Sequence, residues 1–298
     1  MTRVTHNMLG QRSLAGLQGS LTRLAQIQEH LSTGRVINRP SDDPAGATSA
    51  MQVRSSLTQE RQHVRNADDG LGWLAQIDNA LDAIGDQVGR ARDLALQGAN
   101  SGSMGDASRN ALAAEVEQLR QGVIAGANAT YLDRPVFGGL TAGPVAYDAD
   151  GTYVGTPDAD GGVKRTVADG VVVRVDVTGP AVLDDADGDS VMTHMDNLVT
   201  GLRTGDQTMI ETAIGKLTDA SNRIDTMRAD VGTRVQRIEW AKAQADDKEI
   251  SLTNSLSEIE NADLAKTVVE LQLQEVAYQA ALSATGRVIQ PSLLEFLR

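Results

Sequence analysis

A regular repeat of apolar residues between positions 74 and 95 constrains the fold of this 298-residue chain more than any other feature. The repeat advances in alternating steps of three and four residues, through Leu74, Ile77, Leu81, Ile84, Val88, Ala91 and Ala95. A helix with this spacing carries one continuous apolar stripe, which packs against another helix as in a coiled coil. We therefore predict a long helical block from about Pro44 to Gln97, with a break at Gly70 to Gly72.

Helical spacing recurs on both sides of this block. An N-terminal segment with apolar residues from Leu14 to Leu31 predicts a helix that ends near Ser32, with Gly34 as its C-terminal cap. A third helix carries Leu112, Val116, Leu119 and Val123. Two later stripes consist of Ile210, Ile214, Leu217, Ile224, Val231 and Ile238, and of Leu264, Val268, Leu271, Tyr278, Leu282 and Ile289.

Residues 140–190 have a different character, because they are rich in Gly, Asp and Val. The segment GVVVRVDV alternates branched apolar residues with charged ones, which is typical of a half-buried strand. Three copies of the sequence DADG, at Asp148, Asp158 and Asp185, suit tight hairpin turns. We interpret residues 140–190 as a small β-rich insert.

The order of these segments is nested, since helices at the two ends bracket further helices, which bracket the insert. This order predicts a mainly α fold: an elongated rod of long antiparallel helices in a coiled coil, with a small β-rich domain inserted mid-sequence. The expected division is residues 1–40 with 255–298 as terminal helices, 41–139 with 191–254 as a helical rod, and 140–190 as the outer insert. A helix of 50 residues would be about 75 Å long.

Composition excludes several classes of protein. The formal charge of −13 argues against nucleic acid and anionic membranes as partners. The absence of cysteine excludes disulfides, thiolate nucleophiles and cysteine-bound metals. Two Trp, four Tyr and two Phe are too few for aromatic-lined pockets. The first residues lack the apolar core of a cleaved signal peptide, and no apolar run approaches the roughly 18 residues of a membrane span.

The segment LSTGRVINRPSDDPAG, residues 31–46, is dense in charged and turn-forming residues. Asp42 and Asp43 could form a carboxylate pair for acid–base or metal chemistry, with Arg35 and Arg39 as an anion clamp. Capping explains more of the pattern and is the interpretation that we prefer. In this interpretation the segment is a capped connection between two helices, formed by Gly34, Pro40, Asp42, Asp43 and Pro44.

Other motifs give little support for catalysis or for metal or nucleotide binding. The DADG copies lack the ligand spacing, the sixth-position glycine and the twelfth-position glutamate of a calcium-binding helix–loop–helix, so we expect turns there. The histidines are scattered along the sequence and do not have the spacing of metal ligands. They are His6, His30, His63 and His194. Nucleotide-binding glycine loops and hydrolase motifs do not occur. We expect neither an enzyme nor a cofactor.

The apolar stripes of the two ends are wider than two paired helices can bury on each other, because Val269, Leu273 and Val276 broaden the C-terminal one. Assembly with other chains would bury the remainder. The predicted assembly residues are Leu14, Leu17, Leu21, Leu24 and Ile27 at one end, and Leu264, Val268, Leu271, Val276, Leu282 and Leu294 at the other.

The sequence resembles the bacterial flagellin superfamily. The resemblance rests on LSTGRVINRPSDDPAGA, on RNADDGLGWLAQIDNALDAIGDQVGRARDLALQGAN and on the terminal SLLEFLR, and it covers about residues 1–139 and 191–298. Within the superfamily, the form NRPSDDP, Trp73 in GLGWL and the SLLEFLR end are more typical of the junction subunits between hook and filament than of flagellin.

The resemblance implies a function and partners. A junction subunit would be exported without a cleaved signal peptide by the flagellar type III system, with an export chaperone of the FlgN type binding its C-terminal helix. It would then assemble outside the cell as a layer of identical subunits between hook-associated protein 1 and the first flagellin subunits. Two alternatives remain open: flagellin itself, and a calcium-dependent adhesin that uses the insert.

Overall fold

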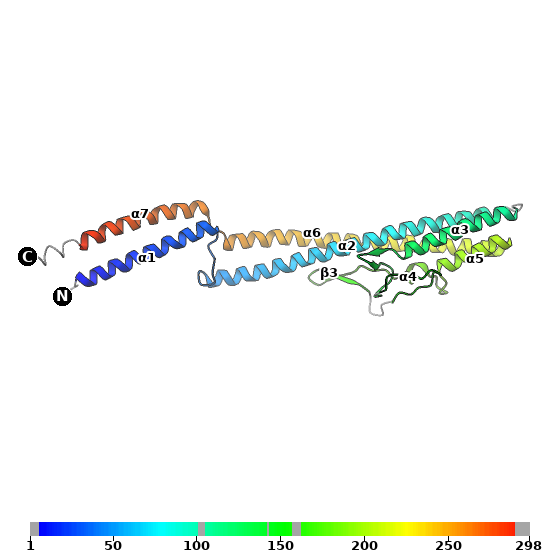
Figure 1. Cartoon of the computed structure of the whole chain (residues 1–298), viewed down its shortest axis with the longest axis horizontal. Helices are drawn as coiled ribbons and strands as arrows, with labels where there is room; N and C mark the ends of the chain where they lie inside the picture. The colour runs from blue at the N-terminus through cyan, green and yellow to red at the C-terminus, as the bar shows by residue number, and fades with distance from the viewer. Residues whose placement is uncertain (1–5, 101–104, 142, 157–161, 290–298) are drawn as a thin grey trace, which may run out of the picture. The chain divides into compact units, whose positions relative to one another are not determined.

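The computed structural model describes residues 6–100, 105–141, 143–156 and 162–289 (Figure 1). The helices in these ranges are α1 (His6–Thr33), α2 (Pro44–Ala99), α3 (Asp106–Ala127), α4 (Gly179–Leu183), α5 (Val191–Thr204), α6 (Gln207–Glu260) and α7 (Leu264–Ile289). With 56 residues, α2 is about 84 Å long.

Two short antiparallel hairpins occupy the middle of the sequence. The first pairs β1 (Thr130–Tyr131) with β2 (Arg134–Pro135), and the second pairs β3 (Lys164–Ala168) with β4 (Val171–Arg174). In the second, Arg165 lies opposite Val173, and the register shifts between Thr166 and Ala168. The predicted class, mainly α with long helices and a small β region inserted mid-sequence, is confirmed.

The chain forms two compact units. Residues 1–58 with 249–298 form one unit, and residues 59–248 form the other, so that α2 and α6 each contribute a part to both. The division of the chain into three domains stays a prediction.

The core of the unit 59–248 is built on the stripe of α2. All seven residues of this stripe, from Leu74 to Ala95, have no exposed surface. They belong to one apolar cluster with residues of α3, α5 and α6, among them Val116, Leu198 and Leu217. The coiled-coil spacing read from the sequence is therefore confirmed. In Figure 1, β3 and α4 lie along one side of the helices of this unit.

The predicted break at Gly70 to Gly72 is wrong, because α2 runs through both glycines without interruption. The glycines serve close packing instead. A Cβ atom on Gly72 would stand 2.4 Å from the hydroxyl oxygen of Tyr131. Tyr131 in turn packs edge-on against buried Trp73, with 5.6 Å between the ring centroids. The motif GLGWL thus fits β1 against α2.

The turn between β1 and β2 has an unusual backbone. Leu132 and Asp133 occupy its two central positions, with φ angles of 47° and 61°. Positive φ at both positions is the geometry of a type I′ hairpin turn, which Asn-Gly adopts most readily. A leucine and an aspartate in this geometry store backbone strain.

In the other unit, α1 and α7 lie side by side (Figure 1). Partly buried residues recur along α1 at steps of three and four positions. They are Gly10, Ser13, Leu17, Ser20, Leu24, Ile27 and Leu31. The corresponding positions of α7 are Thr267, Leu271, Gln274, Tyr278, Ala281 and Thr285. These two sets form the facing surfaces, and the amide Nε2 of Gln274 donates to the backbone oxygen of Ser20 at 3.3 Å.

The stripe expected on α7 has a different register from the surface that faces α1. Leu271 and Tyr278 belong to both, but Leu264, Val268 and Leu282 are exposed. The stripe read from the sequence therefore includes residues on both faces, because α7 is apolar on most of its circumference and spacing alone does not select one face.

Candidate functional site

The two segments that connect the terminal helices to α2 and α6 are joined through their backbones. After α1, Gly34 has a φ angle of 69°, and its N–H donates to the carbonyl oxygen of His30 at 2.9 Å. The N–H of Val36 donates to the oxygen of Glu260 at 2.7 Å, and the N–H of Ala262 donates to the oxygen of Gly34 at 2.9 Å. Residues 34–36 and 260–262 therefore form a minimal antiparallel pair, which we call the joint.

Asp42 organises the rest of the segment that follows α1. Its Oδ2 accepts hydrogen bonds from the N–H groups of Asn38 at 3.1 Å and Arg39 at 2.8 Å. Pro40 lies inside a turn in which the N–H of Asp42 donates to the oxygen of Arg39 at 3.0 Å. The backbone hydrogen bond from Arg39 is the main reason why the pKa of Asp42 is lowered, since it favours the ionised carboxylate.

Asp43 caps the start of α2. Its Oδ1 accepts from the N–H of Ala45 at 3.1 Å, and Pro44 is the first residue of the helix, where proline is favoured. Gly46 leaves room for this cap, because a Cβ atom there would stand 2.5 Å from the Asp43 carboxylate. Both adjacent aspartates thus accept hydrogen bonds from the backbone.

A buried carboxylate lies next to the joint and is paired with half-exposed arginines. The side chain of Glu260 is 4% exposed, and its Oε1 lies 2.7 Å from a guanidinium nitrogen of Arg54. Arg35 approaches the same carboxylate at 3.8 Å. A buried carboxylate requires such partners. Sequence reasoning missed this pair because Arg54 and Glu260 are 206 positions apart, and no local spacing connects them.

The structure separates the predicted assembly residues into two groups. Leu17, Leu24, Ile27 and Leu271 are partly buried between α1 and α7. The exposed group consists of Leu14, Leu21, Leu264, Val268, Val276 and Leu282. Leu294 lies outside the described residues.

The surface of α7 that faces away from α1 is also apolar. Leu273 is 71% exposed and Val276 is 66% exposed, and Val269 is similarly open. Among residues 264–286 the charged ones are Lys266, Glu270 and Glu275. A helix that is apolar all round is typical of a protein interior, so one covered on a single face requires further partners.

The DADG sequences form turns of one type where they are described. In the copy at Asp148, the aspartate Oδ1 accepts from the N–H groups of Asp150 at 3.1 Å and Thr152 at 2.8 Å. The copy at Asp185 repeats this arrangement with Asp187 and Asp189, both at 3.0 Å. The glycine that follows has positive φ in both copies. The prediction of hairpin turns is confirmed for these two, and the copy at Asp158 lies outside the described residues.

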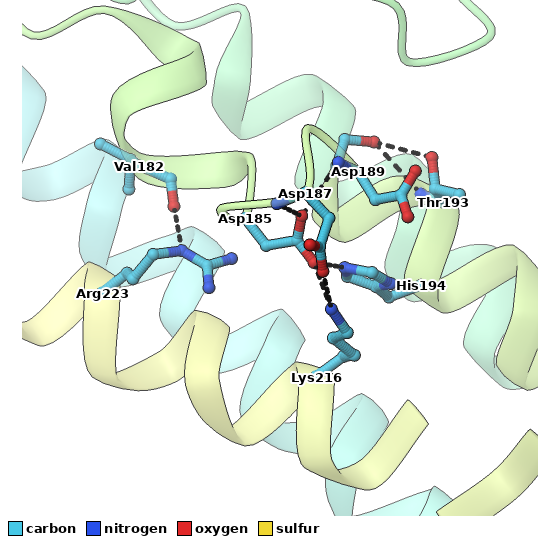
Figure 2. Close-up of polar contacts among 9 residues, drawn as sticks. Val182, Asp185, Asp187, Asp189, Thr193, His194, Lys216 and Arg223 are labelled. Atoms are coloured by element: carbon cyan, nitrogen blue, oxygen red, sulfur yellow. Dashed lines mark hydrogen bonds and ion pairs between the residues drawn. The ribbon is translucent and has the colours of Figure 1, made fainter. Parts of the chain in front are cut away.

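The turn at Asp185 is fixed to the helices by side-chain contacts (Figure 2). Its Oδ2 accepts from Nζ of Lys216 on α6 at 2.7 Å and lies 3.1 Å from Nε2 of His194 on α5. The ammonium of Lys216 also donates to Asp187 at 2.9 Å. These contacts lower the pKa of Asp185 and raise that of Lys216. The lysine ammonium therefore occupies the place beside these carboxylates that a cation would take.

Among the described side chains, His30 and His63 do not share a site. His63 is buried near the carbonyl oxygen of Thr166, and His30 is on α1. Within the described residues, no group of three or more His, Asp or Glu side chains is arranged to hold a metal ion. None of the described helices is both long and apolar enough to cross a membrane.

Comparison with known proteins places both ends of the chain in one family. Residues 4–133 match the bacterial flagellin N-terminal helical region, and residues 214–297 match the bacterial flagellin C-terminal helical region. Flagellar hook-associated protein 3 of Escherichia coli K12 is 23% identical over 306 residues, covering 95% of each chain. Flagellin FlaB1 of Treponema pallidum is 26% identical over 297 residues, covering 99% of each chain.

Solved structures share the fold. The structure of FlgL from Bacillus cereus, 22% identical, matches with a TM-score of 0.59 over 69% of this chain and 99% of that one. The flagellar junction protein FlgL from Legionella pneumophila, 14% identical, matches with a TM-score of 0.57 over 72% of this chain and all of that one. The two matched regions, at opposite ends of the sequence, include all of α1, α2, α3 and α7 and most of α6, and with them the chain belongs to the flagellin superfamily.

Proposed function

We propose that this chain is a structural, non-catalytic subunit of the bacterial flagellum that forms the junction layer between hook and filament. Hook-associated protein 1 would lie on one side of the layer and flagellin on the other. The similarity to hook-associated protein 3 along 95% of both chains supports this choice. The residues that resemble junction subunits, from Asn38 to Pro44, form the cap and turn at the joint.

The observation that carries the proposal is the exposed apolar surface of α1 and α7. Their mutual contact leaves the side chains of Leu21, Val269, Leu273 and Val276 at least 47% exposed. Burying one such side chain contributes about 1.5–3 kcal/mol. Neighbouring subunits that cover these residues would therefore gain a large driving force, and the two helices would become the inner, assembled part of the layer.

The packing that we propose is heterologous, with one surface of a subunit against a different surface of the next. Such a contact that does not close on itself generates an open helical arrangement, so each layer offers the next a template. Before assembly, the apolar surface of α7 would be uncovered. This is a physical reason for an export chaperone of the FlgN type to bind α7 while the chain awaits export without a cleaved signal peptide.

Flagellin is the second candidate, because FlaB1 of Treponema pallidum matches the chain as completely as hook-associated protein 3 does. The two proteins differ in position within the flagellum. A flagellin would form the bulk of the filament, whereas a junction subunit would be confined to a short zone at its base.

Deletion of the gene in the bacterium that encodes it separates the two functions. A strain without the junction subunit should build normal hooks and secrete unassembled flagellin into the medium. A strain without its flagellin should secrete no filament protein into the medium. Electron microscopy of hooks together with immunoblots of the medium would show which holds, and filaments of normal length and number in the deletion strain would overturn the proposal.

A further inference from the structure

A groove between the β3–β4 hairpin and α6 carries an unusual density of positive charge. Its volume is about 760 Å³. It is lined by the basic side chains of Lys164, Arg174, Arg234 and Arg237, with Asp230 as the acidic one. All of these residues belong to the unit 59–248. In a chain with a formal charge of −13, such a cluster needs an explanation.

Part of this charge supports the local structure. Arg234 donates to the carbonyl oxygen of Asp176 at 3.0 Å and pairs with Asp230 at 2.5 Å. Arg174 pairs with buried Asp176 at 2.8 Å. Arg237 differs from both, because it is exposed and makes no ion pair or hydrogen bond with the described residues. Its guanidinium is available to an anionic partner.

Apolar side chains extend this surface at both sides. Val172 of β4 lines the groove and is 46% exposed. Trp240 lies about one turn of α6 beyond Arg237 and is 63% exposed. Exposed tryptophan beside arginine is the composition that dominates binding energy in protein interfaces. We name Val172, Arg237 and Trp240, with the lining cations, the basic groove.

An acidic surface of the same unit shares no residue with the basic groove. Asp82 and Asp86 lie one turn apart on α2, and both are exposed. Gly85 between them packs on α6, where a Cβ atom would stand 3.6 Å from Ile224. The next residue of α6, Asp225, is exposed as well. Asp82 pairs with Arg228 of α6 at 2.6 Å, whereas Asp86 and Asp225 make no ion pair with the described residues. We name the three aspartates the acidic stripe.

We propose that the basic groove of one subunit receives the acidic stripe of an adjacent copy of this chain. The charges are complementary, and each surface has members without an internal ion pair. Because the two surfaces share no residue, the contact is heterologous and leaves both a free groove and a free stripe at the ends of any row of subunits. Opposite charges would set the register of neighbours, with Trp240 contributing apolar contact. This contact rests on the proposed function and specifies the lateral neighbour.

Cysteine cross-linking tests the contact directly, since the chain contains no cysteine. The full chain carries Arg237→Cys together with Asp86→Cys and is expressed in the bacterium in place of the wild type. Mild oxidation of purified flagella should give disulfide-linked dimers and longer products of this chain. The matched control pairs Arg237→Cys with Glu211→Cys, which is exposed and outside both surfaces. The single variants control for random collisions, and several-fold more linked product is expected from the test pair than from the control pair.

Charge exchange provides a second measurement on the same contact. Arg237→Glu should lower incorporation of the chain into flagella several-fold, and Asp86→Arg in the same chain should restore part of it. Circular dichroism of the purified variants should match the wild type, since both residues are exposed. Loss of incorporation without any restoration, in variants that fold, would count against the contact.

The outcomes separate this contact from the proposed function. If the wild-type chain, which has no cysteine, is absent from purified flagella, the proposed function fails and the contact fails with it. If the chain is present and the test pair links no better than the control pair, only the contact is overturned. Linkage to flagellin in place of a second copy also overturns it.

Discussion

Arg54 of α2 donates a hydrogen bond at 2.8 Å to the buried carboxylate of Glu260, at the last residue of α6. The backbone oxygen of the same glutamate accepts from Val36 in the joint. One residue therefore ties three segments together: the start of α2, the end of α6 and the connection that follows α1. Two of the three are more than 200 positions apart in the sequence.

Replacement of Glu260 by Gln should loosen the joint. The substitution keeps the size of the side chain and removes the charge that Arg54 and Arg35 face, and we expect a loss of about 1–2 kcal/mol, because the arginines are half exposed and screened by water. Amide hydrogen exchange at Val36 should accelerate in the variant. The exposed neighbour offers a control, since Glu258→Gln should leave this exchange unchanged. If the Val36 amide exchanges at the same rate in Glu260→Gln as in Glu258→Gln, the ion pair does not hold the joint.

Acid should weaken the turn at Asp42. The pKa of this carboxyl is lowered in the folded chain, so its contribution to stability is present above the unfolded pKa of about 3.9 and is lost as the pH falls through the folded pKa. Asp42→Asn should remove this dependence at acidic pH. Titration of the side-chain carboxyl by NMR gives the pKa, and a value at or above the ordinary one would contradict the prediction.

The β1–β2 turn should accept stabilising substitutions. Leu132→Asn with Asp133→Gly supplies the residues that adopt positive φ at both positions with least strain, and we expect a gain of about 1 kcal/mol in the free energy of unfolding. Chemical denaturation of the full chain would measure the gain. Leu132→Val is the opposite control, because a β-branched residue at positive φ should destabilise the chain.

Charged substitutions should separate assembly from folding of the terminal helices. Leu273 is 71% exposed and Leu21 is 47% exposed, so Leu273→Asp and Leu21→Asp should leave the α1–α7 pair intact and prevent incorporation into flagella. Leu271 faces α1, so Leu271→Asp should also weaken that pair. Glu275→Gln is the control on the same helix. Helix content by circular dichroism and the amount of chain in purified flagella give the two readouts, and normal incorporation of Leu273→Asp would refute the assembly surface.

Sequence reasoning found those parts of the fold that depend on local spacing. The α2 stripe from Leu74 to Ala95 gave the core because each step of three or four residues returns to one face of a helix. The start of α2 followed from Asp43 and Pro44, whose preferences act over one turn. Both features need no knowledge of what packs against them.

The features that were missed depend on distant neighbours. Gly72 suggested a break, but Tyr131, some 60 positions later, fills the space that its missing side chain leaves. The face of α7 that pairs with α1 was not predicted, because apolar residues surround the helix and only contact with α1 shows which face pairs. Arg54 and Glu260 resemble ordinary surface charges until the chain brings them together.

The backbone pairing at the joint has a mechanical consequence. A tensile load applied along α1 reaches residues 34–36, where Val36 is bonded to Glu260 and Gly34 to Ala262. The two connections therefore share the load at this point, because separating them requires both hydrogen bonds to break. In a rotating fibre that transmits torque, such a doubled tether resists stretching better than a single connecting segment of the same length.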